Sequence, residues 1–276
     1  MPWAVMPWAV KPWAKFQSHE CYNSVMNTRD NSRFPLIIAH RGASASAPEN
    51  TLAAFQLAYD QKADGIELDV MLSADKELIV LHDEIVDRTT DGHGTVAAMD
   101  LADLKSLNAA AKFKAGWSGK EALPLLAEVF ELVGNKMLIN VELKNLTQPF
   151  NDLTQRVISL VEKAGLEESI LLSSFNPFNL QVARRCNPKI KRGLLTEGGK
   201  RGGPLRGFFG EAFAYDALHP YFMDVDLNLM RRLHGKRKQV NPWTVDDPQD
   251  LLRLKDLGVD MIITNDPLKA RQVLFG

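Results

Sequence analysis

The sequence predicts one α/β domain of the (β/α)8 TIM-barrel class. From Phe34 onward, short apolar runs alternate with amphipathic segments, the pattern of a mostly parallel sheet covered by helices. The chain has 276 residues, 45% of them hydrophobic, and a barrel of this class needs about 250 residues. A doubly wound open sheet is the competing fold, but no glycine-rich GxGxxG loop follows the first apolar run.

Nine apolar runs are candidate strands. They are residues 36–40, 65–70, 78–82, 137–143, 170–175, 189–195, 217–222, 239–245 and 261–264. A barrel of this class has eight strands, so one run is surplus. The stretch 71–77 is too short for a crossover helix. We therefore expect either 65–70 or 78–82 to be placed irregularly.

Helical segments lie between several of these runs. Periods near 3.6 predict helices over 153–164 and 247–257. Another is expected after Pro48, with Asn50 or Thr51 as its cap.

Two further segments stand apart from the strand and helix repeats. Residues 83–123 contain glycine-rich turns around a helical stretch near 101–107, and we interpret them as a small insertion after the third strand. Residues 1–33 repeat a Met-Pro-Trp-Ala-Val unit, and regular prolines break both helix and strand. We expect an irregular extension there, outside a fold domain of residues 34–276.

Composition excludes several function classes. The 33 basic and 34 acidic side chains nearly cancel, so no overall field favours nucleic acid. Neither Cys21 nor Cys186 has the spacing of a zinc or redox motif. No apolar run approaches the roughly 20 residues of a membrane span, although peripheral lipid contact stays open. Sparse cysteines and the lack of a signal-like start indicate a cytoplasmic protein.

Acidic side chains interrupt the strands near their carboxyl ends, which form the catalytic face of a barrel. Glu67 and Asp69 are two apart in one strand, so both point to the same side, into the barrel mouth, where Glu142 can join them. Three converging carboxylates repel one another unless a cation neutralises them, and oxygen ligands suit Mg²⁺, Ca²⁺ or Mn²⁺ better than Zn²⁺. The alternative is that they pair with Arg41 and Lys144.

Two histidines, His40 and His82, end the first and third predicted strands. Histidine changes its charge near neutral pH, so the pair suggests a base and an acid on opposite sides of a scissile bond. Arg41, through its planar fork, and Lys144, as a point charge, would contact a phosphate group. Either cation can instead be a salt-bridge partner.

Together these motifs resemble the glycerophosphodiester phosphodiesterase family, over about residues 37–267. The motifs are His40-Arg41-Gly42, Pro48-Glu49-Asn50-Thr51, Glu67-Leu68-Asp69-Val70, His82-Asp83, Arg88-Thr89-Thr90, Gly92-His93-Gly94, Val141-Glu142-Leu143-Lys144 and Trp243-Thr244-Val245. The resemblance implies a barrel with a small insertion, corresponding here to 83–123. It also implies hydrolysis of small glycerophosphodiesters to glycerol 3-phosphate and an alcohol.

Site roles follow from the same resemblance. It implies that one divalent cation, Mg²⁺ or Ca²⁺ with Mn²⁺ as a further option, is held by Glu67, Asp69 and Glu142. The general acid and base would be His40 and His82, and the phosphate contacts would be Arg41 and Lys144. Candidates for the alcohol pocket at later strand ends are Phe175, His219 and Trp243, although aromatic residues there are as often core.

The mechanism implied by the resemblance leaves two routes open. A neighbouring hydroxyl of the substrate can attack to give a cyclic phosphate, or water can attack directly. Which histidine is the acid and which the base is open as well.

Rival functions are also open. A phospholipase acting on lysophospholipids or other membrane phosphodiesters would need an apolar or basic rim, for which Phe208 and Phe209, near Lys200 and Arg201, are candidates; a solvated loop is the other interpretation. A non-catalytic barrel that binds a phosphorylated ligand would be expected to have lost a histidine or a carboxylate. An enolase-like lyase would need a further base opposite the metal, and no such motif beyond Lys144 is visible.

Overall fold

The computed structural model describes residues 34–114 and 116–276. The predicted extension over residues 1–33 lies outside the described residues. The strands are β1 (Leu36–His40), β2 (Gly65–Leu72), β3 (Leu78–Val80), β4 (Leu138–Leu143), β5 (Ile170–Ser174), β6 (Lys191–Thr196), β7 (Ala217–Pro220), β8 (Gln239–Val240) and β9 (Met261–Thr264).

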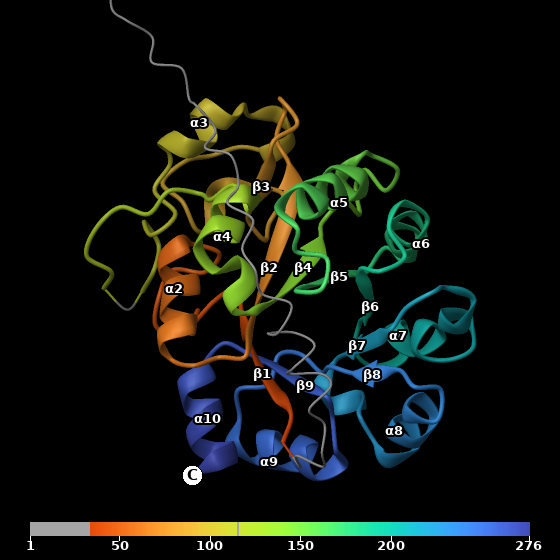
Figure 1. Ribbon diagram of the computed structural model, residues 1–276. Coiled ribbons are helices and arrows are strands. Elements are labelled where there is room, and N and C mark those ends of the chain that lie inside the picture. The colour runs from red at the N-terminus through yellow and green to blue at the C-terminus, as the bar shows by residue number, and fades with distance from the viewer. Residues whose placement is uncertain (1–33, 115) are drawn as a thin grey trace, which may run out of the picture.

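Eight of these strands form a nearly closed parallel barrel within the part of the chain that the structure describes (Figure 1). Their order round the sheet is β8, β7, β6, β5, β4, β2, β1, β9. Backbone hydrogen bonds from Asp260 N to the Val240 carbonyl and from Ile263 N to the Pro242 carbonyl, both 3.0 Å, connect the two ends. The predicted barrel class is confirmed.

The surplus strand is β3, which pairs antiparallel with β2 and lies off the barrel path. Val70 is opposite Val80, and Leu72 is opposite Leu78, so β2 extends past the barrel into a hairpin. The insertion therefore follows the third strand of the chain but the second strand of the barrel. Its apolar side chains, among them Val86 and Leu104, pack with Ile79 of β3 in a separate buried cluster.

Several predicted strand bounds were too long. The run 78–82 forms a strand only to Val80, so His82 lies beyond β3 and does not end it. The run 239–245 is regular strand only to Val240, but Asn241 N and Trp243 N still donate to the Leu218 and Pro220 carbonyls. His82 thus lies in a loop at the carboxyl end of the barrel, whereas Trp243 stays beside the end of β7.

Helices surround the barrel. The α-helices are α2 (Leu52–Asp60), α3 (Leu101–Ser106), α4 (Leu126–Val133), α5 (Leu153–Ala164), α6 (Pro177–Cys186), α7 (Gly199–Arg206), α8 (Leu227–His234), α9 (Pro248–Leu257) and α10 (Pro267–Phe275). Short 3-10 helices are η1 (Val86–Arg88), η2 (Val96–Ala98), η3 (Gly134–Lys136), η4 (Phe209–Ala212) and η5 (Phe222–Asp224). Thr51 caps α2, since its side chain accepts from Ala54 N.

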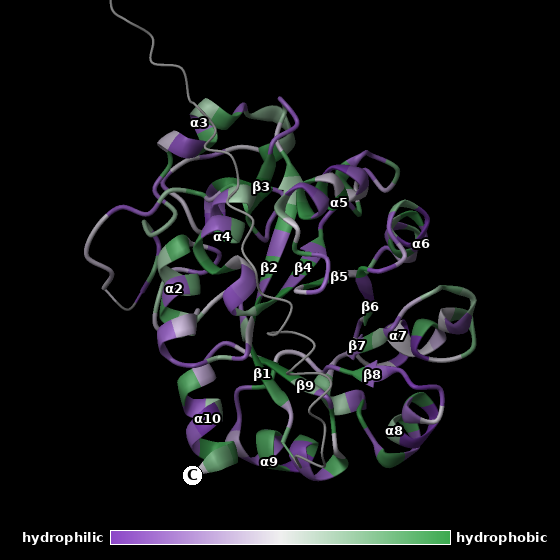
Figure 2. Cartoon of the chain, in the orientation of Figure 1, coloured by the Kyte–Doolittle hydropathy of each residue, from purple (hydrophilic) through white to green (hydrophobic). Residues whose placement is uncertain are grey.

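The strands alternate between a helix-facing side and an interior side. Leu68 and its neighbours at even positions of β2 belong to the large cluster under the helices, so Glu67 and Asp69 face the barrel interior. Figure 2 accordingly shows hydrophilic residues among the hydrophobic ones of β2. Ile38 and Ile263 belong to a separate apolar cluster inside the barrel. The described residues include no helix with the length and apolar character that a bilayer crossing requires.

Candidate active site

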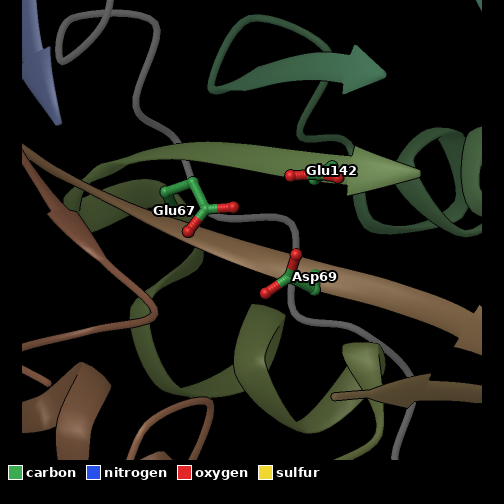
Figure 3. A group of neighbouring side chains, drawn as sticks. All are labelled: Glu67, Asp69 and Glu142. Atoms are coloured by element: carbon green, nitrogen blue, oxygen red, sulfur yellow. The ribbon is translucent and has the colours of Figure 1, made fainter. Parts of the chain in front are cut away.

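Three buried carboxylates converge inside the barrel. Glu67 and Asp69 come from β2 and Glu142 from β4, and the pairing of Asp69 with Glu142 brings the two strands into register. One oxygen from each of the three groups lies within 4.8 Å of the others. Figure 3 shows the three side chains gathered over the two strands. The alternation of side chains along the strand had predicted that Glu67 and Asp69 share one face, where Glu142 can join them.

These carboxylates carry more negative charge than their surroundings balance. Burial, together with Asp69 and Glu142, raises the pKa of Glu67 well above its ordinary value. Burial and the Asp69 carboxylate raise the pKa of Glu142 to about 7. The pKa of Asp69 is lowered, because Lys144 and Arg41 outweigh its burial. Glu67 and Glu142 therefore favour either a bound proton or a neighbouring cation.

The donor set fits a hard divalent cation. Carboxylate oxygens that share Ca²⁺ at about 2.3–2.6 Å can lie up to roughly 5 Å apart, and those that share Mg²⁺ lie somewhat closer. The oxygen separation of at most 4.8 Å is within reach of this range. A cation there would also relieve the repulsion that raises the pKa values of Glu67 and Glu142.

Two cations border the carboxylates, as the alternative interpretation expected. Arg41 Nε lies 3.5 Å from Asp69, and Lys144 Nζ lies 3.0 Å from Glu142 and 3.6 Å from Asp69. Arg41 follows β1 with a positive φ of 56°, and its backbone N–H donates to Glu67. Both side chains are only partly exposed at the mouth, so each can face a substrate anion while it contacts a carboxylate.

His40 is held by a chain of polar groups behind its ring. Its Nδ1 lies 2.7 Å from Asn265 Oδ1, which also accepts from the Ser44 hydroxyl. Asn265 Nδ2 donates to Asp246 at 2.6 Å, which fixes the amide orientation and makes His40 Nδ1 the donor. The free Nε2 then lies 3.9 Å from Glu67. Burial and the adjacent Arg41 lower the pKa of His40 to about 4.

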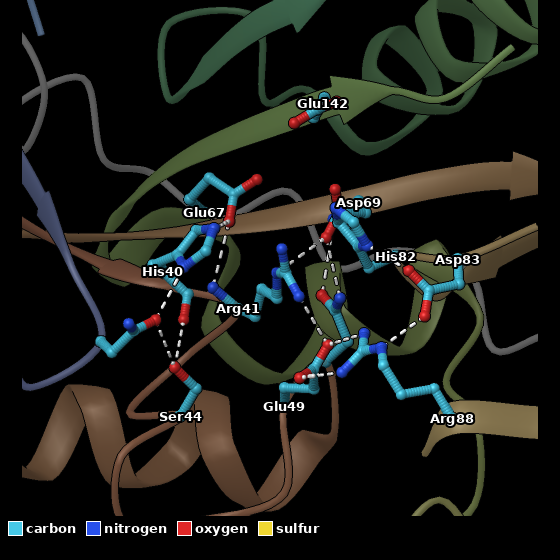
Figure 4. Close-up of polar contacts among 12 residues, drawn as sticks. His40, Arg41, Ser44, Glu49, Glu67, Asp69, His82, Asp83, Arg88 and Glu142 are labelled. Atoms are coloured by element: carbon cyan, nitrogen blue, oxygen red, sulfur yellow. Dashed lines mark hydrogen bonds and ion pairs between the residues drawn. The ribbon is translucent and has the colours of Figure 1, made fainter. Parts of the chain in front are cut away.

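His82 has a different partner. Its Nδ1 lies 2.5 Å from Asp83 Oδ1, and Asp83 also accepts from Arg88. Arg88 forms a double hydrogen bond with Glu49 at 2.8 and 2.7 Å, and Glu49 in turn accepts from Arg41. Figure 4 shows this continuous chain from His82 to Arg41. It fixes the two sides of the site relative to each other.

Burial and polar neighbours have opposing effects on the pKa values of the residues in this hydrogen-bonded network. Burial lowers the pKa of His82, although Asp69 opposes this effect. Burial alone would raise the pKa of Glu49, but hydrogen bonds from Arg88 and Arg41 lower it to about 2. Glu49 is therefore a permanent anion between two arginines.

Sequence reasoning gave no role to several residues of this network. Glu49 and Arg88 stood in quoted motifs without an assignment, and Asp246 and Asn265 were not singled out. The signal for Asn265 was its place directly after the last strand, next to the first strand in a closed barrel. Glu49, Asp246 and Asn265 line a cavity of about 620 Å³ together with His40 and Arg41.

The residues predicted to line an alcohol pocket separate into two groups. Phe175 and Trp243 pack edge to face, with ring centroids 5.6 Å apart, and both are partly exposed at strand ends. His219 differs from the expectation, because it has no exposed surface. Its ring points into the barrel interior beside Gly193 and lies 3.1 Å from Asn241 Nδ2. It cannot touch an alcohol in this arrangement.

Comparisons with known proteins agree on one family. A model of the glycerophosphoryl diester phosphodiesterase family matches residues 40–269. A glycerophosphodiester phosphodiesterase of Caldanaerobacter subterraneus subsp. tengcongensis is 40% identical over 233 residues, which are 84% of this chain and 94% of that protein. One of Bacillus altitudinis is 33% identical over 86% of this chain and 97% of that protein.

Solved structures share the fold. A phosphodiesterase of Oleispira antarctica, solved in complex with the product sn-glycerol-3-phosphate, has a TM-score of 0.76 and 29% identity. The match covers 88% of this chain and 98% of that one. With a family model over most of its length and relatives at this level of identity, the chain belongs to the glycerophosphoryl diester phosphodiesterase family and is a phosphoric diester hydrolase.

Proposed function

We propose that this enzyme hydrolyses small glycerophosphodiesters to glycerol 3-phosphate and an alcohol, with a divalent cation and with His40 and His82 as the proton carriers. One observation carries the proposal. Two histidines, each tied at Nδ1 by a different partner, lie at the mouth that holds the buried triad of Glu67, Asp69 and Glu142. The product bound to the Oleispira antarctica relative supports glycerol 3-phosphate as the product here.

The metal ligands would be Glu67, Asp69 and Glu142. When bound, Mg²⁺ or Ca²⁺, or alternatively Mn²⁺, would supply positive charge that stabilises the phosphorane-like transition state. The protonation preference of Glu67 and Glu142 supports this assignment, because both groups take up positive charge where no metal balances them. Arg41 and Lys144 would bind the phosphate oxygens from the solvent side.

The hydrogen bonds of the two rings support different roles. His40 donates from Nδ1 to a neutral amide, and its lowered pKa of about 4 keeps Nε2 unprotonated and ready to accept a proton from the attacking hydroxyl. Burial lowers the pKa of His82 as well, but its Nδ1 is shared with the Asp83 carboxylate, which favours the imidazolium form more than a neutral amide does. We therefore assign His40 as base and His82 as acid in the first step.

One experiment tests substrate, reaction and metal together. Release of glycerol 3-phosphate would be measured from a panel of glycerophosphodiesters before chelation, in excess chelator, and after Mg²⁺, Ca²⁺ or Mn²⁺ is restored. We expect chelation to abolish turnover and one hard cation to restore it. Full turnover in excess chelator would exclude the metal role, and turnover without glycerol 3-phosphate would exclude the reaction.

The attacking group can be identified separately. In heavy-oxygen water, direct attack labels the phosphate in one step, whereas attack by a substrate hydroxyl first gives a cyclic glycerol phosphate. A cyclic species that appears and decays within a single turnover would support the intramolecular route. Its absence at every time point would favour direct attack by water.

A further inference from the structure

Exposed apolar side chains gather on one half of the barrel mouth. The set comprises Leu146 and Phe150 after β4, Phe178 at the start of α6 after β5, and Met223 and Leu227 after β7. We call it the apolar arc. Phe150 is 84% exposed, Met223 69% and Leu146 61%, among the largest exposures of any apolar side chain in the described residues. Parallel strands bring their carboxyl ends to the same face, so these loops all border the active site.

The arc is continuous with the aromatic wall of the site. Phe150 and Phe178 have ring centroids 6.0 Å apart, and Phe178 also packs against Phe213. On the inner side, Trp243 contacts both Phe175 and Tyr221. The helices α5, α6, α7 and α8 that follow these strands succeed one another round one side of the barrel (Figure 1).

Positive charge lies in the middle of the arc. Lys200 and Arg201 begin α7 directly after β6, between Phe178 on one side and Met223 on the other. Both are exposed, and no ion pair or hydrogen bond holds either side chain in the described residues. Arg206, farther along α7, is instead engaged by Asp224 at 3.0 Å. The arc thus combines apolar tips with two uncommitted cations.

The aromatic pair Phe208 and Phe209, the sequence-based candidate for such a rim, follows the carboxyl end of α7 and is not part of the arc. Glu211 of the same turn is 2.9 Å from Lys236 and 3.8 Å from Lys238, which precede β8 at the amino ends of the strands. Phe213, two residues farther on, packs against Phe178, so this turn reaches the edge of the arc.

We propose that the apolar arc docks the enzyme onto an anionic lipid surface. Apolar side chains on loop tips, interleaved with lysine and arginine, are the chemistry of interfacial binding, in which tips enter the acyl region and cations meet anionic headgroups. A protein on the same arc would cover the mouth and obstruct the substrate. A lipid surface instead presents phosphodiester headgroups to it. The inference goes beyond hydrolysis, because docking is measurable without turnover.

Vesicle co-sedimentation tests the proposal directly. The full chain is mixed with vesicles of phosphatidylcholine alone or of phosphatidylcholine with phosphatidylglycerol at about three to one, and the bound fraction is measured at low and high salt. We expect binding to the phosphatidylglycerol vesicles that weakens with salt. No binding to either vesicle at low salt would overturn the proposal.

Variants locate the contact. Phe150→Ser combined with Met223→Ser should lower the vesicle partition coefficient at least tenfold, since apolar burial drives insertion. Lys200→Glu combined with Arg201→Glu should lower it at least fivefold for each charge, and only on anionic vesicles. Phe275→Ser, at the exposed carboxyl end of α10 on the opposite face of the barrel, is the matched control and should bind as the parent does. An equal loss in this control would contradict the placement of the contact on the arc.

Two further measurements distinguish lipid docking from a loss of activity and from self-association of the protein. Turnover of a soluble glycerophosphodiester should be unchanged in the double serine variant, so loss of docking is distinguishable from loss of the proposed function. Sedimentation velocity reports self-association. If the parent chain dimerises, the double serine variant is monomeric and neither binds vesicles, the arc is a protein interface and the lipid proposal is wrong.

Discussion

Adding a divalent cation to the metal-stripped enzyme should release protons, and the number released should depend steeply on pH. Burial and Asp69 raise the pKa of Glu142 to about 7, and the pKa of Glu67 is raised as well. A carboxyl group with this pKa holds about 0.9 proton near pH 6 and about 0.1 near pH 8. The cation must displace that proton. Its apparent affinity should therefore rise about tenfold over this interval through Glu142 alone.

Isothermal titration calorimetry in two buffers with different ionisation enthalpies gives the proton count directly. Glu142→Gln should lose most of the release near pH 6, because it removes one carboxyl and also one cause of the raised pKa of Glu67. Glu131→Gln, the same change at an exposed position of α4, should release protons as the parent does. Tight cation binding without proton release near pH 6, or unchanged release in Glu142→Gln, would refute the assignment of the triad as the metal site.

Three further outcomes follow from the same geometry. Changing His40 or His82 to Ala should lower kcat by about 10²–10⁴ while the circular dichroism spectrum is retained; near-parental turnover in the double variant would exclude both as proton carriers. Asn265→Ala should lower kcat more than it raises KM, and should add little to His40→Ala, because it acts through the ring; additive losses would contradict this coupling. Burial lowers the pKa of His219 to about 3, so the unfolded state alone takes up a proton as pH falls below about 6.5, which should destabilise the fold by about 2.7 kcal/mol near pH 4.5. His219→Gln should remove this part of the acid sensitivity in urea unfolding, and an unchanged pH profile would count against it.

Local patterns were enough for the barrel and for the acidic cluster. The alternation of Glu67, Leu68 and Asp69 determines which side chains face inward, because a strand has a fixed period of two. The shortness of 71–77 showed that one neighbouring run was irregular, but not which one. That choice depends on which run continues the parallel order next to β4, and the pairing of Asp69 with Glu142 settles it in favour of β2.

The sequence did not predict how deep an inward-facing side chain lies within the barrel. An inward-facing residue can reach the mouth or lie inside the core, and the stagger between neighbouring strands decides which. His219 and Trp243 both looked like candidates for a pocket wall. His219 pairs with Leu195 on β6 and is fully enclosed, whereas Trp243 lies beyond β8 and keeps part of its ring exposed. Register across several strands separates the two, and no single segment contains it.

The hydrogen-bond partners of the two histidines could not be predicted from the sequence either, and they matter most for the mechanism. In sequence, His40 and His82 are equivalent proton carriers, each at or near a strand end. In the fold, the ring of His40 meets the amide of Asn265, 225 positions away, while the ring of His82 meets the carboxylate of the adjacent Asp83. Burial and Arg41 favour the neutral ring of His40 more than the Asn265 amide oxygen favours the charged ring, whereas the Asp83 carboxylate offsets part of the effect of burial on His82. In the proposed mechanism, this difference in surroundings, and not the histidines themselves, would make His40 the base and His82 the acid.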